Sequence, residues 1–259
     1  MQGCVCPHPP ILIPEIGRTS RETIAATVAA MERLADTLGD DRTVVIISPH
    51  TPGYMDAHTV KTAPTLRGDF GDFARAQVGS EIANDVEFVN ALLAAAREQE
   101  TVVLEPEPSG LLDHGVLVPM HFIRAGSLVS LSVVGAYESH RALGQLVRRC
   151  ADELGRDVVF VASADLSHRL TPSAPAGYDP QGSVFDRRVV ELLSEGDFAG
   201  LTLLDGSLVQ AAGQCGLRSL VALGGFLGDE ASRNPQIFSY EGPFGVGYLV
   251  AGFGLGQAD

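Results

Sequence analysis

Residues 43–50, TVVIISPH, and residues 158–168, VVFVASADLSH, decide the fold of this chain. Each stretch opens with an uninterrupted apolar run rich in β-branched residues, a pattern typical of a strand that is buried on both faces of a sheet. Each run ends in a short polar turn that carries a histidine. The two stretches therefore predict two buried strands, each with a histidine beyond its carboxyl end.

The segments around these two runs alternate between strand-like and helix-like patterns. Residues 20–38 place apolar side chains at intervals of three or four, which predicts a helix. This alternation predicts one α/β domain over residues 1–259, with a central, mostly parallel or mixed sheet flanked by helices. Glu105 and Glu107, which neighbour prolines, are expected in a solvated loop. Further helices are expected over 81–99, 139–154, 185–193, 197–204 and 214–227, strands over 128–134 and 248–253, and long loops, of the kind that often wall a functional site, over 51–77 and 169–182.

The composition limits the partners of the chain. Its 259 residues include 32 acidic and 18 basic side chains, a formal net charge of −14. Binding to phosphates requires a positive surface, so this balance argues against nucleic acid and anionic membrane as partners. The sequence contains no apolar run of about 18 residues and no segment that resembles a signal peptide, so we expect a cytoplasmic protein.

The four cysteines are expected to be free thiols, because no secretory segment accompanies them. Cys4 and Cys6 have a C-x-C spacing, which differs from the C-x-x-C of redox and zinc motifs. We expect these two thiols to be mobile near the N-terminus.

Histidines supply the strongest functional signal in the sequence. His50 and His168 follow the two buried runs, and His8 and His114 lie in neighbouring loops that contain proline or glycine. Ligands bind beyond the carboxyl ends of strands in open α/β sheets, so these four side chains are candidates for one pocket, where imidazole serves as metal ligand or proton carrier. A histidine at a strand end is also often an ordinary polar residue, and the spacing alone leaves both interpretations open. The remaining histidines are assigned to that ordinary class: His58, His121 and His140.

Six short motifs occur in a fixed order: HPPILIPEIG, IISPH, LLDHGVLVPMHF, VVFVASADLSHRL, AGQCGLRSLVALGGFL and SYEGPFGVGYLVAGF. Together they resemble the catalytic (LigB-type) subunit of the class III extradiol ring-cleavage dioxygenases, over about residues 7 to 253. The Cys-Gly-Leu-Arg segment and the turn before His168 look closer to the Memo branch of this superfamily and to the LigB-like proteins associated with AMMECR1 domains.

The resemblance implies a role for each candidate residue. It makes His8 and His50 two metal ligands and His168 the acid/base residue that takes a proton from a catechol and later returns one. His114 is expected to line the pocket and to hydrogen-bond substrate or oxygen. Asp165 is a candidate for orienting His168.

The resemblance leaves three candidates for the third metal ligand. Ring-cleaving members use a glutamate late in the chain, whereas the corresponding stretch here contains Gln214 and Cys215. A cysteine matches this place in the Memo branch, so we expect Cys215 to be the ligand, with Glu241 as the alternative and Gln214 third. A carboxylate at this position favours oxygenase chemistry, and a thiolate favours the Memo-like interpretation.

The expected function follows from these assignments. The resemblance implies a non-haem, Fe(II)-dependent protein, with zinc or copper as alternative metals, that opens the ring of a small aromatic diol with O2. The alternative is a Memo-like metal- or ligand-binding protein without ring cleavage. A homo-oligomer and a small partner subunit are both compatible with the resemblance, and the substrate is not identified by it.

Overall fold

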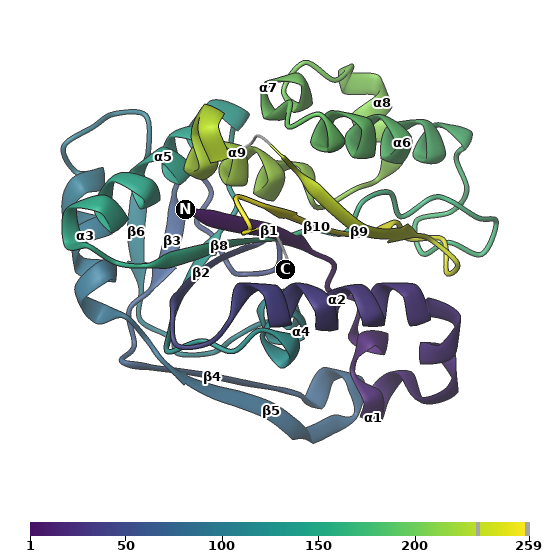
Figure 1. Ribbon diagram of the computed structural model, residues 1–259, viewed down its shortest axis with the longest axis horizontal. Coiled ribbons are helices and arrows are strands. Elements are labelled where there is room, and N and C mark those ends of the chain that lie inside the picture. Colours follow the sequence, from purple (N-terminus) through teal and green to yellow (C-terminus); the bar gives the residue numbers. More distant parts are fainter. Residues whose placement is uncertain (232–233, 257–259) are drawn as a thin grey trace.

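A mixed sheet of eight strands forms the centre of the protein, whose computed structural model describes residues 1–231 and 234–256. The strand order is β6-β3-β7-β2-β8-β1-β10-β9 (Figure 1). The four central strands β7, β2, β8 and β1 run parallel, and β10 and β9 continue the sheet antiparallel. This confirms the predicted α/β fold. The strands are β1 (Gln2–Cys6), β2 (Thr43–Ser48), β3 (His58–Lys61), β6 (Leu104–Glu107), β7 (Ser127–Ser132), β8 (Val158–Ser163), β9 (Gln236–Glu241) and β10 (Tyr248–Phe253).

The apolar runs in β2 and β8 are continuous because both faces of the sheet are covered. Successive side chains of a strand point to opposite faces. Val45 and Ile47 pack into one hydrophobic cluster. Val44 and Ile46, which alternate with them along β2, pack into the other cluster. Every residue of β2 and β8 is buried.

Helices cover each face of this sheet (Figure 1). Helices α2 (Ala25–Leu38) and α4 (His114–Phe122) contribute to the core on one face. The other face is covered by α3 (Val86–Ala96), α5 (Tyr137–Leu154), α6 (Pro180–Ser194), α7 (Phe198–Leu201), α8 (Gly206–Ala212) and α9 (Leu217–Ala231). A short helix α1 (Pro14–Gly17), 3-10 turns over Pro10–Leu12, Arg18–Ile24 and Gly71–Phe73, and a separate hairpin of β4 (Thr65–Phe70) and β5 (Arg75–Ala83) complete the described part. Within it, no helix is both long and apolar enough to cross a membrane.

Two glycines allow α5 and α9 to pack closely. A Cβ atom on Gly144 of α5 would lie 2.0 Å from the carbonyl oxygen of Ala222, and one on Gly225 of α9 would lie 2.1 Å from that of Arg141. Both contacts are with backbone, which cannot move aside as a flexible side chain does. Any side chain at either position would therefore push the two helices apart.

The region between β2 and α3 differs from the expectation. Residues 51–77 were expected to be a loop and 81–99 a helix, but the chain forms β3, β4 and β5 before α3 begins at Val86. The strand β3 has the sequence HTVK and is buried along its whole length, with Lys61 paired to Glu107. The sequence of β3 lacks the apolar pattern that predicts a buried strand. Its buried lysine is compensated by an ion pair instead of being replaced by a hydrophobic residue.

Two further expectations, for Glu105 and Glu107 and for Cys4 and Cys6, are also wrong. Glu105 and Glu107 belong to strand β6, which pairs with β3, and not to a loop, although Glu105 is exposed to solvent as expected. Cys4 and Cys6 are fully buried in β1, between β8 and β10, and are not mobile. The expectation of free thiols is confirmed for all four cysteines.

Candidate metal centre

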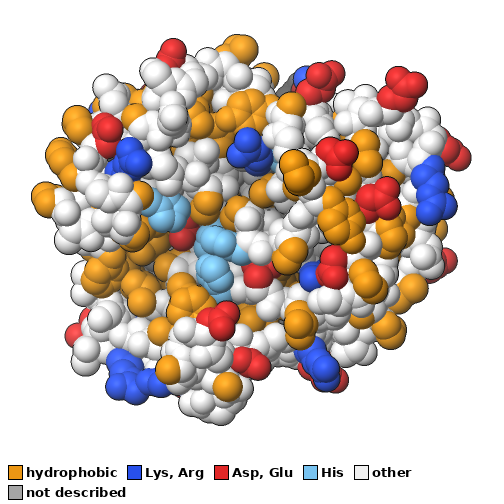
Figure 2. Space-filling model, turned by 180° about the vertical axis from the view of Figure 1, so that it is seen from behind, with side chains coloured by type: hydrophobic (Ala, Val, Ile, Leu, Met, Phe, Trp, Pro, Cys, Tyr) orange, Lys and Arg blue, Asp and Glu red, His pale blue; other side chains and the backbone are white. Residues whose placement is uncertain are grey.

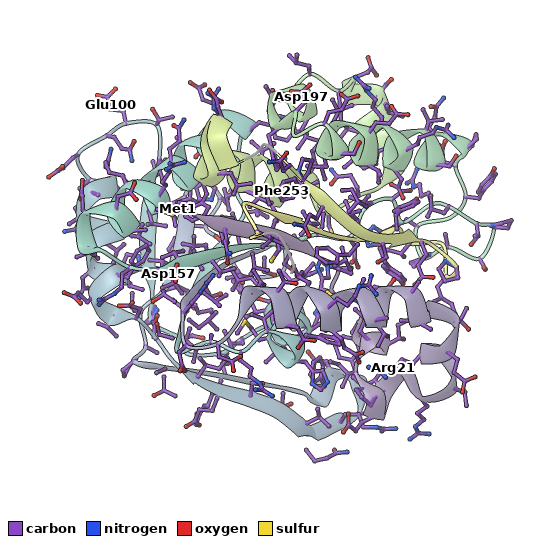
Figure 3. The ribbon with its side chains drawn as sticks, viewed as in Figure 1. Met1, Arg21, Glu100, Asp157, Asp197 and Phe253 are labelled. Atoms are coloured by element: carbon purple, nitrogen blue, oxygen red, sulfur yellow. The ribbon has the colours of Figure 1, made fainter. Side chains whose placement is uncertain are left out.

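The carboxyl ends of β1, β2 and β8 meet at one edge of the sheet, because the three strands are parallel and adjacent. Met1 and Asp157, at the amino ends of β1 and β8, lie on the same side of the molecule in Figure 3. His8 follows β1 and His50 follows β2, so both reach the opposite edge. Their rings meet edge to face with centroids 4.9 Å apart, and the two Nε2 atoms are 3.1 Å apart.

Cys215 brings a third ligand atom to these histidines. It lies in the turn between α8 and α9, and its Sγ atom is 3.7 Å from His8 Nε2. The ligand atoms of His8, His50 and Cys215 all lie within 4.8 Å of one another, and among the described residues this is the one such group of histidine, cysteine and carboxylate side chains. His8 is buried and His50 is exposed, so the group reaches from the protein interior to solvent.

The two other candidates for the third ligand are engaged elsewhere. Glu241, at the end of β9, accepts hydrogen bonds through Oε1 from the backbone nitrogen of Thr27 (2.7 Å) and from its hydroxyl (2.5 Å). Gln214 accepts a hydrogen bond from the backbone nitrogen of Leu217 at the start of α9. The structure thus brings Cys215 to the histidines, and it does not bring Glu241 there.

Hydrogen bonds determine which nitrogen of His8 is free. The Ser163 hydroxyl donates its single hydrogen to the carbonyl oxygen of Gly115 (2.6 Å), so it must accept from His8 Nδ1 (2.8 Å). The lone pair of neutral His8 is therefore on Nε2, which faces His50 and Cys215. Burial, and then the neighbouring histidines, lower the pKa of His8 well below its usual value and keep the ring neutral. This is the tautomer and charge state that a metal ligand requires.

Asp165 contacts His8 and not His168, contrary to the expected role. Its Oδ1 atom accepts a hydrogen bond from the backbone nitrogen of His8 (2.9 Å), and its Oδ2 atom is 3.7 Å from His8 Nε2. Burial raises the pKa of Asp165 to about 7. Burial, and then the charge of Asp165, raises the pKa of the Cys215 thiol to about 12, so a nearby cation is needed to hold it as a thiolate at neutral pH.

Sequence reasoning missed Asp113, which supports the loop that carries His50. The hydroxyls of Ser48 (2.7 Å) and Thr51 (2.5 Å) donate to its two carboxylate oxygens. Partial desolvation lowers the pKa of His50, and the Asp113 carboxylate opposes this shift. Asp113 is the N-cap residue of α4 but makes no capping hydrogen bond with its side chain. The sequence signal that could have identified Asp113 is its position directly before the candidate residue His114.

His114 and His168 lie beside the group of possible ligands. The His114 ring centroid is 4.2 Å from that of His50 and 5.4 Å from that of Phe73. Burial lowers the pKa of His168, while the carbonyls of Leu166 and Gly213 oppose the shift. Both rings are partly buried, and their lowered pKa values favour the neutral form that accepts a proton.

The histidines assigned to the ordinary class are not among the three converging ligands. His58 and His140 form a buried pair with ring centroids 4.7 Å apart, and His121 lies at the end of α4. Figure 2 shows histidine side chains that reach the surface near the middle of one face, in a hollow bordered by hydrophobic side chains.

Comparison with known proteins places the chain in a family. Residues 2–251 match the family model described as the catalytic LigB subunit of aromatic ring-opening dioxygenase. The Clostridium acetobutylicum protein named Protein CA_C1420 is 32% identical over 260 residues, which cover 94% of this chain and 55% of that protein. This chain therefore spans about half the length of the curated relative it matches. The structure of the uncharacterized Escherichia coli K12 protein JW3007 has the same fold, with a TM-score of 0.67 at 17% identity over 97% of this chain and 99% of that one.

The family match covers nearly the whole described sheet and all the residues that meet at its carboxyl edge. The resemblance expected from the six motifs is thereby confirmed at the level of the family and the fold. This chain belongs to the family of catalytic LigB subunits of aromatic ring-opening dioxygenases.

Proposed function

We propose that this protein is a metal-dependent enzyme of the extradiol-dioxygenase type, which opens the ring of a small catechol-type aromatic with O2. The observation that carries the proposal is the meeting of the ligand atoms of His8, His50 and Cys215 within 4.8 Å of one another. His114 and His168 beside them are the groups that can move protons.

The donor set suits a transition metal. His8 offers Nε2 in the required tautomer, since Ser163 holds its Nδ1, and the Cys215 thiol needs a cation to ionise. Fe(II) is the metal that the family implies, and two imidazoles with a thiolate also suit zinc or copper. A bound Fe(II) ion would supply the Lewis acidity and redox chemistry that a diol and O2 need in order to react.

The remaining side chains supply binding and proton transfer. In this proposal neutral His168 accepts a proton from a catechol hydroxyl and returns it after ring opening, a role typically worth about 10²–10⁴-fold in rate. His114, at the start of α4, lines the site with Phe73, which offers an aromatic edge to the substrate ring. Asp113 and Asp165 hold the His50 loop and the His8 backbone in position.

One observation favours a second candidate function. Cys215 stands where ring-cleaving relatives are expected to carry a carboxylate, and Glu241 is bound to α2 instead. A thiolate makes a softer site, which favours a Memo-like metal- or ligand-binding protein without ring cleavage.

Metal analysis after anaerobic purification and Fe(II) loading tests both candidates. The comparison uses wild type, the double variant His8→Ala/His50→Ala and the control His121→Ala, whose side chain is exposed at the end of α4. The dioxygenase is supported if wild type and control bind stoichiometric iron and the double variant does not. The iron-loaded wild type should then convert a catechol to a yellow ring-opened product. Tight binding of zinc or copper, without binding of iron, favours the second candidate. The absence of metal from all three proteins contradicts the dioxygenase and the metal-binding form of the second candidate.

A further inference from the structure

Asp186, on α6, is a fully buried carboxylate that is held by two neutral donors. Its Oδ1 atom accepts a hydrogen bond from the backbone nitrogen of Ser167 (2.8 Å), and its Oδ2 atom accepts one from the Tyr240 hydroxyl (2.7 Å). Removing a carboxylate from water is unfavourable unless its oxygens are hydrogen-bonded or a cation lies beside it. Here the compensation comes from neutral donors, and one of them belongs to the residue directly before His168.

Asp186 acts as an acceptor with both oxygens at neutral pH. Burial raises the pKa of its carboxyl to about 6, while the hydrogen bonds from Tyr240 and Ser167 oppose the shift. Burial, and then the charge of Asp186, raises the pKa of the Tyr240 hydroxyl, which therefore stays protonated and donates. Near pH 7 the ionised carboxylate thus holds the Ser167 amide with one oxygen and Tyr240 with the other.

Three segments of the chain meet at this carboxylate. A Cβ atom on Gly247, directly before β10, would be 2.0 Å from Asp186 Oδ2, so the carboxylate rests on that glycine. The carbonyl of Gly247 accepts from the Leu166 nitrogen (2.9 Å), and its nitrogen donates to the Ser167 carbonyl (2.8 Å). Helix α6, the turn between β9 and β10, and the segment before His168 are therefore joined at Asp186.

The contact with Ser167 bears directly on the ring of His168. Burial lowers the pKa of His168, and the Leu166 carbonyl is the first of two carbonyls that oppose this shift. That carbonyl and the Ser167 N–H belong to the same planar peptide group. The hydrogen bond from Ser167 to Asp186 therefore fixes the direction of a carbonyl that acts on the His168 ring.

We propose that Asp186 is a positioning residue for His168, which it orients through the peptide group between Leu166 and Ser167. The inference rests on the proposed function, in which His168 moves protons, and it names the side chain that holds this histidine in place. The role requires a hydrogen-bond acceptor and not a charge, because a neutral amide oxygen can also accept from the Ser167 nitrogen.

Two replacements of Asp186 separate acceptance from charge. Asp186→Ala removes both hydrogen bonds. Asp186→Asn keeps an oxygen for the Ser167 nitrogen and places an amide nitrogen beside the Tyr240 hydroxyl, which can accept as well as donate. Tyr240→Phe removes one hydrogen bond only and serves as the milder variant if the alanine protein does not fold.

Asp85→Ala is the matched control for a general loss of stability. Asp85 is also a buried carboxylate that accepts from a backbone nitrogen, that of Phe88 (3.0 Å), and from a hydroxyl, that of Thr43 (3.1 Å). It additionally pairs with Arg156, which makes its removal at least as severe. Thr43 begins β2, so this carboxylate lies at the amino edge of the sheet, opposite to His168.

Each protein is measured in three ways after thermal unfolding has established that it is folded. Metal content is determined after Fe(II) loading, and kcat and KM are determined with catechol. The third measurement is the NMR signal of the ¹³C-labelled His168 ring in the zinc-loaded, diamagnetic protein. This signal reports the surroundings of the ring even in a protein that opens no substrate.

Asp186→Ala is expected to keep its metal and its KM within about twofold, to lose about 10–100-fold in kcat, and to shift the His168 ring signal. Asp186→Asn should recover kcat to within about threefold of wild type and restore the signal, because the acceptor for Ser167 is present again. Tyr240→Phe should change both quantities in the direction of Asp186→Ala, by less. Asp85→Ala should leave the His168 signal and kcat as in wild type.

Several results would overturn the inference. Asp186→Asn that is as slow as Asp186→Ala would assign the role to charge, and an equal shift of the His168 signal in Asp85→Ala would assign it to general loosening. An Asp186→Ala protein with unchanged signal and kcat, or one that loses its metal, would also contradict it. If wild type opens no catechol ring, the proposed function fails, whereas a His168 signal that shifts in Asp186→Ala and returns in Asp186→Asn supports the inference.

Discussion

The protein contains two groups of clustered histidines, and they differ in what their ring nitrogens contact. At the carboxyl edge of the sheet, the Nε2 atoms of His8 and His50 face each other and the Cys215 thiol. Near the end of β7, His58 and His140 also pack edge to face, with both residues buried. Burial lowers the pKa of histidines in both groups. Proximity and burial are therefore shared, and neither identifies a functional site.

The hydrogen bonds make the difference. His58 Nδ1 contacts the carbonyl of Ser132 and its Nε2 contacts the Ser139 hydroxyl, so both nitrogens are used within the protein. In His8 the Nδ1 atom is hydrogen-bonded to the Ser163 hydroxyl. Its Nε2 atom faces a cluster that includes the Cys215 thiol. A histidine whose second nitrogen converges with other soft ligands is equipped to bind a metal, whereas His58 mainly contributes to packing.

Replacing His168 tests the edge group most severely. The variant His168→Ala should keep its metal, because the ring is not among the three converging ligands, and should lose about 10²–10⁴-fold in turnover as its proton carrier disappears. Parallel metal analysis and single-turnover assays check this. Loss of metal together with activity would show that His168 is a ligand, and the assignment of roles would be wrong.

Removing the hydroxyl behind His8 tests the importance of its tautomer. In Ser163→Ala, Nδ1 loses its acceptor and Nε2 can carry the proton, so metal affinity should fall about 10–100-fold, as is usual when a group that orients a ligand is lost. Competition with a chelator measures the affinity. An unchanged affinity would mean that Ser163 does not select the nitrogen that faces the cluster.

The matched change at the second histidine pair should have the smallest effect. Ser139→Ala removes the partner of His58 Nε2 and should lower the free energy of unfolding by about 1 kcal/mol without changing metal affinity. Denaturant unfolding and the same chelator competition measure the two quantities. A change in metal affinity here would remove the proposed distinction between the two groups.

Much of the fold was predictable because its central strands are buried on both faces. The runs in β2 and β8 are continuous in sequence for the same reason that they are central in the sheet. Strands with polar sequences escaped prediction. In β3, Lys61 is buried because Glu107 on the neighbouring strand β6 pairs with it, and that partner is distant in sequence.

The candidate site was predictable to the same extent. His8, His50, His114 and His168 were all identified from their places after strands or in adjoining loops, and the structure brings them to one edge. Asp113 and Ser163 were missed, because a single hydrogen bond across the sheet edge has no local pattern.

The sequence alone determined that this chain forms an α/β sheet with histidines beyond its strands, since hydrophobic burial and strand direction both leave local patterns in the sequence. Only the tertiary structure brings Cys215 to the histidines and binds Glu241 to Thr27 instead. It also decided which nitrogen of His8 is free. Such choices depend on contacts between residues far apart in the chain, which only the packed fold brings together.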